Sequence, residues 1–249
     1  MAPFTDDPLV LPVVGVVFLA TLVRSAFGFG EALVAVPLLG LIVPIRVAVP
    51  LATLLSIAIA ALILAQDWRH IHVRSAWWLT LPTFVGIPIG LFLLTEVSPG
   101  PVKVAMAAVI IGFSCYCLFG RRKPQLSDDR FAWAFGFGAG ILGGAYGMNG
   151  PPLVVYAALR GWSPEHFRAT LQGYFLPASA AGMLGFWLAG LWVPDVTRYF
   201  LLSIVPAAFA VLIGRVANRR MHPEVFVRYV HVGLIGIGLV LLAQSVWGE

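Results

Sequence analysis

Residues 25–39 read SAFGFGEALVAVPLL, and residues 144–159 read GAYGMNGPPLVVYAAL. In each stretch glycines interrupt an apolar run, and glycine permits backbone conformations that other residues avoid. The apolar pieces that follow the breaks, 31–43 and 150–159, are too short to cross a bilayer comfortably. In lipid, backbone N–H and C=O groups must find partners within their own segment, so isolated strands are not stable there. Each stretch therefore predicts a helix, a sharp break and a second, shorter helix.

The rest of the chain has the composition of a protein whose solvent is largely lipid. Of its 249 residues 60% are hydrophobic and only 11% are Asp, Glu, Lys or Arg, where a soluble domain carries about a quarter. Eight apolar runs approach the roughly 20 residues of a spanning helix. These runs cover 9–27, 46–65, 76–95, 102–119, 131–147, 166–191, 196–214 and 226–247. We predict an all-α polytopic membrane protein with eight long spans and two short half-helices, forming one transport domain over residues 1–249.

The two halves of the chain resemble each other. The triplet AFG at 26–28 corresponds to AYG at 145–147, and ATL at 52–54 recurs at 169–171 with nearly the same separation. The order of long and short apolar runs is also the same in both halves. These observations predict an internal duplication. The two repeats cover approximately residues 8–120 and 130–247.

Loop charges indicate how the repeats are oriented. Each repeat contains one broken pair, which adds an even number of crossings, and three further spans, so the second repeat is inverted relative to the first. With the N-terminus outside, 12 of the 16 Lys and Arg residues fall in inner loops, as the positive-inside rule requires. They are Arg69, Arg74, Arg121, Arg122, Lys123, Arg130, Arg160, Arg168, Arg215, Arg219, Arg220 and Arg228. We predict an inner-membrane protein with both termini outside and, because its basic residues serve orientation, no nucleic-acid partner.

The breaks are where the sequence predicts a small-anion site. The first N–H groups of a helix have no intrahelical partner and carry the positive end of the helix dipole, which favours anions. Inversion of the repeats would bring the two helix starts together near the midplane. The candidate substrate-binding residues are Gly28, Phe29, Gly30, Glu31, Thr53, Gly147, Met148, Asn149, Gly150, Pro151, Thr170 and Gln172. Close helix packing explains the glycines equally well, and hydroxyl bonds to their own backbone explain the threonines.

Charged residues at or near membrane depth are functional candidates by default. Arg24 can pair with the anion, pair with Glu31 seven residues on, or extend to the inner surface. Glu31 can cap a helix start, pair with Arg24, or titrate during proton coupling. Arg168 lies at an inner boundary and suits either a topology anchor or a gate. No cofactor is expected, and no metal site, because His70 and His72 have no further ligand nearby in sequence.

The same residues resemble the signatures of the TauE/SafE membrane transporter family. GFGEALVAVPL at 28–38 resembles the family's first signature, and GILGGAYGMNGPP at 140–152 resembles the matching second one. The segment FRAT at 167–170 is similar to the next block, and the resemblance extends over essentially the whole chain. Phe29 and Glu31 depart from the more glycine-rich first motif of many members. The resemblance implies export of a small anion: sulfite, a sulfonate such as sulfoacetate, or a related organic acid.

A secondary transporter that works by alternating access and is coupled to protons is the function that best fits these features. The chain contains no Walker-type nucleotide loop, so direct use of ATP is not expected. The predicted spans contain no Ser/His pair that could act as nucleophile and base, and no pair of aspartates, in corresponding positions. This argues against an intramembrane enzyme. An anion channel and an importer of a small organic acid remain alternatives. The oligomeric state stays open, a homodimer included, and membrane lipid is the expected surrounding.

Overall fold

A computed structural model describes residues 7–27, 29–67, 73–119, 126, 129–162 and 164–220, and residues 231–232, 234–236, 238–239 and 242–243 near the C-terminus. Within these residues the backbone forms helices and short connections and no strand, so the all-α prediction is confirmed for this part of the chain. The first five helices are α1 (Val10–Phe27), α2 (Glu31–Leu39), α3 (Ile45–Asp67), α4 (Val73–Glu96) and α5 (Pro99–Phe119). A 3-10 helix η2 (Asp129–Phe131), α6 (Ala132–Tyr146), α7 (Gly150–Arg160), α8 (Pro164–Leu188) and α9 (Pro194–Arg220) follow. Most of the eighth predicted run, 226–247, lies outside the described residues.

Both predicted glycine breaks are present. Gly30 adopts a left-handed φ of 95° directly before α2, and Gly147 adopts a φ of 68° between α6 and α7. Residues with a Cβ pay a steric cost in this region, which explains glycine at both positions. The short helix α2 ends earlier than predicted, because residues 40–43 form tight turns in front of Pro44. Proline disfavours helical backbone in the residue before it, so the helix cannot run smoothly through 43.

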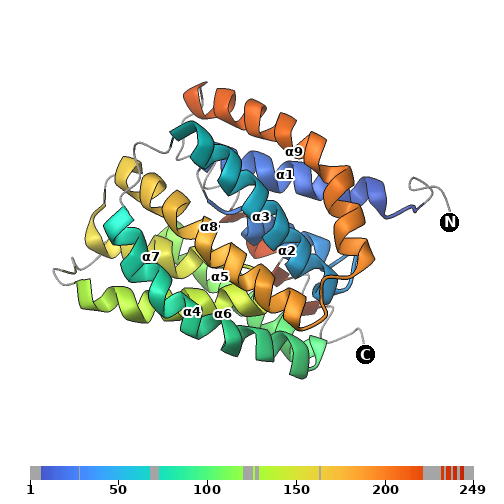
Figure 1. Ribbon diagram of the computed structural model, residues 1–249, viewed down its shortest axis with the longest axis horizontal. Helices are drawn as coiled ribbons and strands as arrows, with labels where there is room; N and C mark the ends of the chain where they lie inside the picture. The colour runs from blue at the N-terminus through green and yellow to red at the C-terminus, as the bar shows by residue number, and fades with distance from the viewer. Residues whose placement is uncertain are drawn as a thin grey trace.

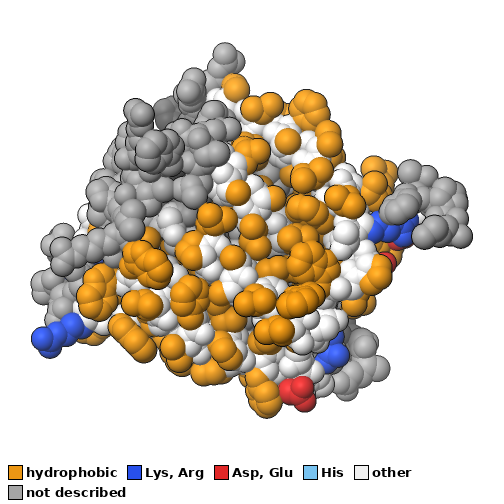
Figure 2. Space-filling view, viewed as in Figure 1, with side chains coloured by type: hydrophobic (Ala, Val, Ile, Leu, Met, Phe, Trp, Pro, Cys, Tyr) orange, Lys and Arg blue, Asp and Glu red, His pale blue; other side chains and the backbone are white. Residues whose placement is uncertain are grey.

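The outer surface of the helices is apolar. Three helices contain segments that are long and apolar enough to cross a bilayer: Ile45–Leu62, Ala76–Glu96 and Pro194–Gly214. Shorter apolar segments lie in α1 (Val10–Ala26) and α5 (Val104–Tyr116). Figure 2 shows a face covered mainly by hydrophobic side chains, with the few charged ones at its margins. A multi-pass membrane protein is therefore supported, while the total of eight spans stays a prediction.

The long helices are arranged around a central pair, α3 and α8, which pack against each other (Figure 1). Along one edge α1 packs against α9, and along the opposite edge α4 packs against α6. The α4–α6 contact is close because glycines face each other there. A Cβ added at Gly140 would collide with the backbone carbonyl of Thr83, and one added at Gly144 with that of Ile87. Small residues let membrane helices approach in this way.

Polar contacts join helix ends at the two ends of the bundle. At one end, Arg46 at the start of α3 donates to the carbonyl of Thr95 near the end of α4, at 2.6 Å. At the opposite end, the N–H of Leu126 donates to the carbonyl of Leu159 at the end of α7, at 2.8 Å. In Figure 1 the starts of α3 and α9 lie at the right, and the starts of α4 and α8 lie at the left. Hydrogen bonds between residues far apart in the sequence therefore connect neighbouring helix ends.

Asp7 connects the start of α1 to the start of α9. Its carboxylate accepts hydrogen bonds from the backbone N–H of Leu9 and from the hydroxyl of Tyr199, both at 2.9 Å, and lies 3.5 Å from a guanidinium nitrogen of Arg198. These contacts, the Leu9 N–H above all, hold the pKa of Asp7 below its usual value. The first helix and the ninth therefore begin at the same end of the bundle.

Candidate functional site

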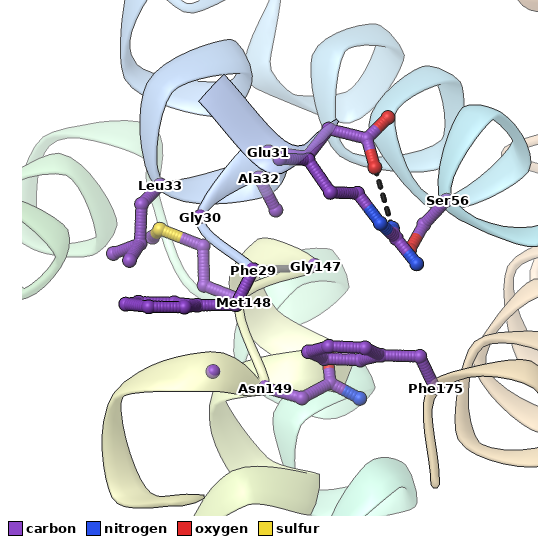
Figure 3. Close-up of a pocket in the computed structure, with 12 residues that line it drawn as sticks. Phe29, Gly30, Glu31, Ala32, Leu33, Ser56, Gly147, Met148, Asn149 and Phe175 are labelled. Carbon is purple, nitrogen blue, oxygen red and sulfur yellow. Dashed lines mark hydrogen bonds and ion pairs between the residues drawn. The ribbon is translucent and has the colours of Figure 1, made fainter. Parts of the chain in front are cut away.

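The two glycine breaks meet inside the bundle. A Cβ added at Gly150, at the start of α7, would lie only 3.8 Å from a ring carbon of Phe29 in the first break. Together the breaks enclose a cavity with a volume of about 20 Å³, room for roughly one water molecule (Figure 3). Its lining consists of Arg24, Phe29, Gly30, Glu31, Ala32, Leu33, Ser56, Gly147, Met148, Asn149, Gly150 and Phe175.

A buried ion pair forms one wall of this cavity. Arg24 stands in the last turn of α1 and Glu31 is the first residue of α2, so the break turns the two side chains toward each other. Arg24 Nη1 donates to Glu31 Oε2 and to the Ser56 hydroxyl, both at 2.6 Å, as Figure 3 shows for the carboxylate. The Arg24 and Glu31 side chains are 2% and 3% exposed. Arg24 is therefore paired with Glu31 in the described structure and its side chain is buried, while its contact with an anion stays a prediction.

One edge of the Arg24 guanidinium has no partner among the described residues. Arg24 Nε and Nη2 are buried and make no hydrogen bond, and the same is true of Glu31 Oε1. The Nε–H and one Nη2–H of an arginine point in the same direction, which is the geometry that binds an oxyanion through two parallel hydrogen bonds. A buried donor without a partner costs about 1–3 kcal/mol, and more when it carries charge. The site is thus poised to accept an oxygen ligand.

Aromatic and amide groups complete the cavity wall. The ring of Phe175, from α8, lies 5.0 Å from the Arg24 guanidinium carbon, a cation–π distance. In Figure 3 this ring lies between the ion pair and Asn149 of the second break. The Asn149 side chain packs so closely on Gly143 that a Cβ added there would be 2.8 Å from its amide oxygen. Its amide also interacts with the hydroxyl of Tyr174 on α8. Asn149 is therefore held in place at the cavity by its neighbours.

Both short helices begin at the cavity. Gly30, which precedes α2, supplies no side chain to cap its first N–H groups, and the next residues, Ala32 and Leu33, line the cavity. At the second break, Asn149 and Gly150 line it where α7 begins. The positive ends of two helix dipoles therefore lie at the cavity that Arg24 also lines. Arg24 and the two helix starts are features that favour an anion, whereas Glu31 adds a negative charge to the same cavity.

The structure brings most of the predicted residues together. Phe29, Gly30, Glu31, Gly147, Met148, Asn149 and Gly150 line the cavity with Arg24, whereas Thr53, Pro151 and Thr170 do not. The Thr53 hydroxyl donates to the carbonyl of Val49 in its own helix, at 3.0 Å, so this threonine follows the structural alternative. Gly28 lies outside the described residues, as do the side chains of Arg168 and Gln172. Substrate contact by any of these residues stays a prediction.

Sequence reasoning missed Ser56 and Phe175. Ser56 follows Thr53 by three residues, so it shares a helix face with a residue that had been singled out, and this spacing was a usable signal. Phe175 carries no comparable signal, because an aromatic residue in an apolar span looks the same whether it faces lipid or a site. Its role depends on the packing of α8 against α3.

Comparison with known proteins points to a transporter family. The family described as "Sulfite exporter TauE/SafE" matches residues 13–241 of the chain, a range that includes both breaks. A protein of Cupriavidus necator, named "Probable sulfite/organosulfonate exporter TauE", is 26% identical over 251 residues. That alignment covers 96% of this chain and 98% of the relative. No solved structure matches the chain.

Proposed function

The chain belongs to the sulfite exporter TauE/SafE family, and from that premise we propose that it is a secondary transporter that exports a small anion across the inner membrane. The proposed substrate is sulfite, a sulfonate such as sulfoacetate, or a related sulfur compound. The proposed mechanism is proton-coupled alternating access. The single observation that carries the proposal is the cavity that the starts of two short helices line together with Arg24, whose Nε and Nη2 have no partner among the described residues.

The hydrogen-bond donors at this cavity suit the oxygens of a sulfur oxyanion. Two oxygens of a sulfite or sulfonate group can accept parallel hydrogen bonds from Arg24 Nε and Nη2. Backbone N–H groups at the two helix starts and the Asn149 amide then offer further donors to the remaining oxygen. The apolar side chains of Phe29, Met148 and Phe175 exclude water, which strengthens each of these interactions.

The size of the cavity favours a carrier over a channel. A volume of about 20 Å³ suits roughly one water molecule, whereas sulfite alone has four heavy atoms. The helices around the breaks must therefore move before such an anion enters, as alternating access requires. In proteoliposomes, flux that saturates with anion concentration is expected, and linear flux would favour a channel.

Helix packing supports an inverted duplication as the framework for that motion. The first broken helix, α1, runs parallel to α9, because Asp7 ties their starts together and the Ser25 hydroxyl donates to the carbonyl of Val211 further along, at 2.7 Å. In the corresponding contact, α6 packs against α4. Each broken helix thus packs on the fourth helix of the other half, the arrangement expected when two copies exchange equivalent surfaces.

This duplication predicts that both termini lie outside the cytoplasm. A reporter enzyme active only in the periplasm, fused after Glu249, is expected to be active, because two repeats with an odd number of crossings each give an even total, which returns the chain to its starting side. The same reporter inserted in the loop 66–75 is expected to be inactive and serves as the control. Activity of a cytoplasm-dependent reporter at the C-terminus would contradict the inverted arrangement.

Substitutions at the second break should abolish ligand binding. We expect Asn149→Ala and Gly147→Leu to remove the thermal stabilisation that sulfite or sulfoacetate gives the purified protein. A ligand at 100 times its Kd stabilises by about 2.7 kcal/mol, so the loss is measurable by thermal unfolding. Leucine at 147 would be strained at a φ of 68°, and its Cβ would lie 3.1 Å from the Thr53 hydroxyl oxygen.

Gly190→Leu is the matched control for backbone strain. Gly190 has a similar φ of 71°, but a Cβ there meets nothing within 4 Å, and the residue lies in the turn between α8 and α9. This variant should lose some stability and keep the ligand response. If Asn149→Ala keeps the full response to every anion tested, the binding site lies elsewhere. Taurine, thiosulfate and acetate complete the panel of ligands.

A further inference from the structure

The cavity contains a negative charge of its own. Glu31 and Arg24 are the two charged or titratable side chains among the described residues that line it. The phenols of Tyr146 and Tyr174 are buried nearby in the chain but do not line the cavity, and the Tyr174 hydroxyl contacts Thr83 at 2.8 Å. Another buried titratable group, His231, contacts Ser114 and Phe113 of α5 instead. The charge balance of the cavity therefore depends on one arginine and one glutamate.

A substrate anion bound to Arg24 Nε and Nη2 would give the cavity a net negative charge. With Glu31 ionised, two negative charges would share one buried cation, and one of them would remain without compensation. Burying an uncompensated charge in an apolar site is strongly unfavourable. Glu31 Oε1 has no hydrogen-bond partner in the described protein, and Arg24 is the one cationic side chain among the described residues that line the cavity, so no second side-chain cation balances the added charge. Neutralisation of Glu31 by a proton removes the conflict.

We propose that Glu31 is the built-in counter-anion of Arg24, and that a substrate anion binds at Arg24 only as the Glu31 carboxylate takes up one proton. In the empty state Arg24 and ionised Glu31 sum to zero charge. In the loaded state Arg24, a monovalent anion and protonated Glu31 again sum to zero. The proton comes from water on the side to which the cavity opens, and it returns to water when the anion leaves. This inference rests on the proposed anion site and adds its coupling.

A definite stoichiometry follows. One proton moves in the same direction as each anion, so transport of a monovalent anion carries no net charge and does not respond to the membrane potential. Export then proceeds when the outward concentration gradient of the anion exceeds the inward proton gradient. Ionised Glu31 also keeps Arg24 neutralised in the empty carrier, so both states that must cross the apolar barrier are uncharged overall.

The test measures how affinity depends on pH in the purified, full-length protein. Methanesulfonate is the probe, because it carries a single negative charge that does not titrate near neutral pH. Amine buffers are used because sulfonate buffers are themselves candidate ligands. For the wild type, the Kd of methanesulfonate is expected to rise about tenfold per pH unit over the range in which Glu31 is ionised in the empty protein. A weakly buffered sample should turn alkaline on binding, with about one proton taken up per anion.

Variants separate this coupling from binding itself. Glu31→Gln is expected to bind methanesulfonate with a Kd that does not change with pH, because the amide is permanently neutral. Arg198→Gln, which removes a charge that pairs with Asp7 at the helix ends, should keep the wild-type slope. The proton-uptake measurement on wild type stands by itself if Glu31→Gln does not fold.

Wild-type binding without a pH slope or proton uptake would overturn this inference alone. Absence of binding at every pH would overturn the anion site, and the inference with it.

Discussion

Replacement of Arg24 by glutamine is expected to lower the free energy of unfolding by about 3–5 kcal/mol, the usual cost of removing one partner from a buried ion pair. The loss arises because Glu31 would remain at 3% exposure without its cation. Ser56 and Phe175 would lose their contacts with the guanidinium as well. Thermal and denaturant unfolding of the detergent-purified protein measure the change.

A second substitution tests whether charge is the cause. In the double variant Arg24→Gln/Glu31→Gln both side chains are neutral and similar in shape, so most of the stability should return while anion binding stays lost. Arg198→Gln provides the comparison, because its pair with Asp7 is partly exposed and such pairs contribute about 1 kcal/mol or less. If the double variant is as unstable as Arg24→Gln alone, packing around the guanidinium outweighs the charge, and this prediction is wrong.

Gly144→Ala is expected to destabilise the protein by about 3 kcal/mol, at the upper end of what overpacking costs. The added methyl group would collide with the backbone carbonyl of Ile87 on α4. Backbone cannot rotate aside as a side chain can, so α4 and α6 must separate along their length. Because α6 ends at the second break, anion binding should weaken in parallel with stability.

Gly138→Ala is the control within the same helix. A Cβ at Gly138 meets nothing within 4 Å, so the substitution should be neutral or stabilising by up to about 1 kcal/mol, the difference in helix propensity between the two residues. Gly140→Ala, which would collide with Thr83, should behave like Gly144→Ala. Unfolding temperatures of the three variants give the comparison. Equal stability for Gly138→Ala and Gly144→Ala would mean that α4 and α6 are not in backbone contact.

Features that depend on local rules were predictable. Each described helix lies where an apolar run predicted it, and the left-handed glycines lie at the breaks, because hydropathy and φ are properties of a residue and its neighbours. The α2 helix ends four residues before the predicted end at 43, because Pro44 disfavours helical backbone in the residue before it even within a continuous apolar run. Even there, the cause is a residue that can be read in the sequence.

The partner of each side chain across the bundle was harder to predict. For Arg24 the sequence left three alternatives open: pairing with the anion, pairing with Glu31, or extension to the inner surface. The sequence does not decide among them, because the position of the side chain depends on the angle between the two helices at the first break. Ser56 reaches Arg24 from 32 residues away. Phe175 comes from another helix of the opposite half. Contacts of this kind depend on helix packing, to which residues throughout the chain contribute.

The sequence alone determined that two apolar helices break and restart, at residues 25–39 and 144–159. In lipid each segment must satisfy its own backbone hydrogen bonds, which favours helices. Only glycine adopts the left-handed conformation at the breaks at little energetic cost. Only the tertiary structure decided that the two breaks share one cavity and that Glu31 occupies one side of Arg24 while the other stays free. The reason is that an ion pair needs its nitrogen and oxygen atoms within about 4 Å of each other. Such distances result from the packing of α1, α2, α3 and α8 together.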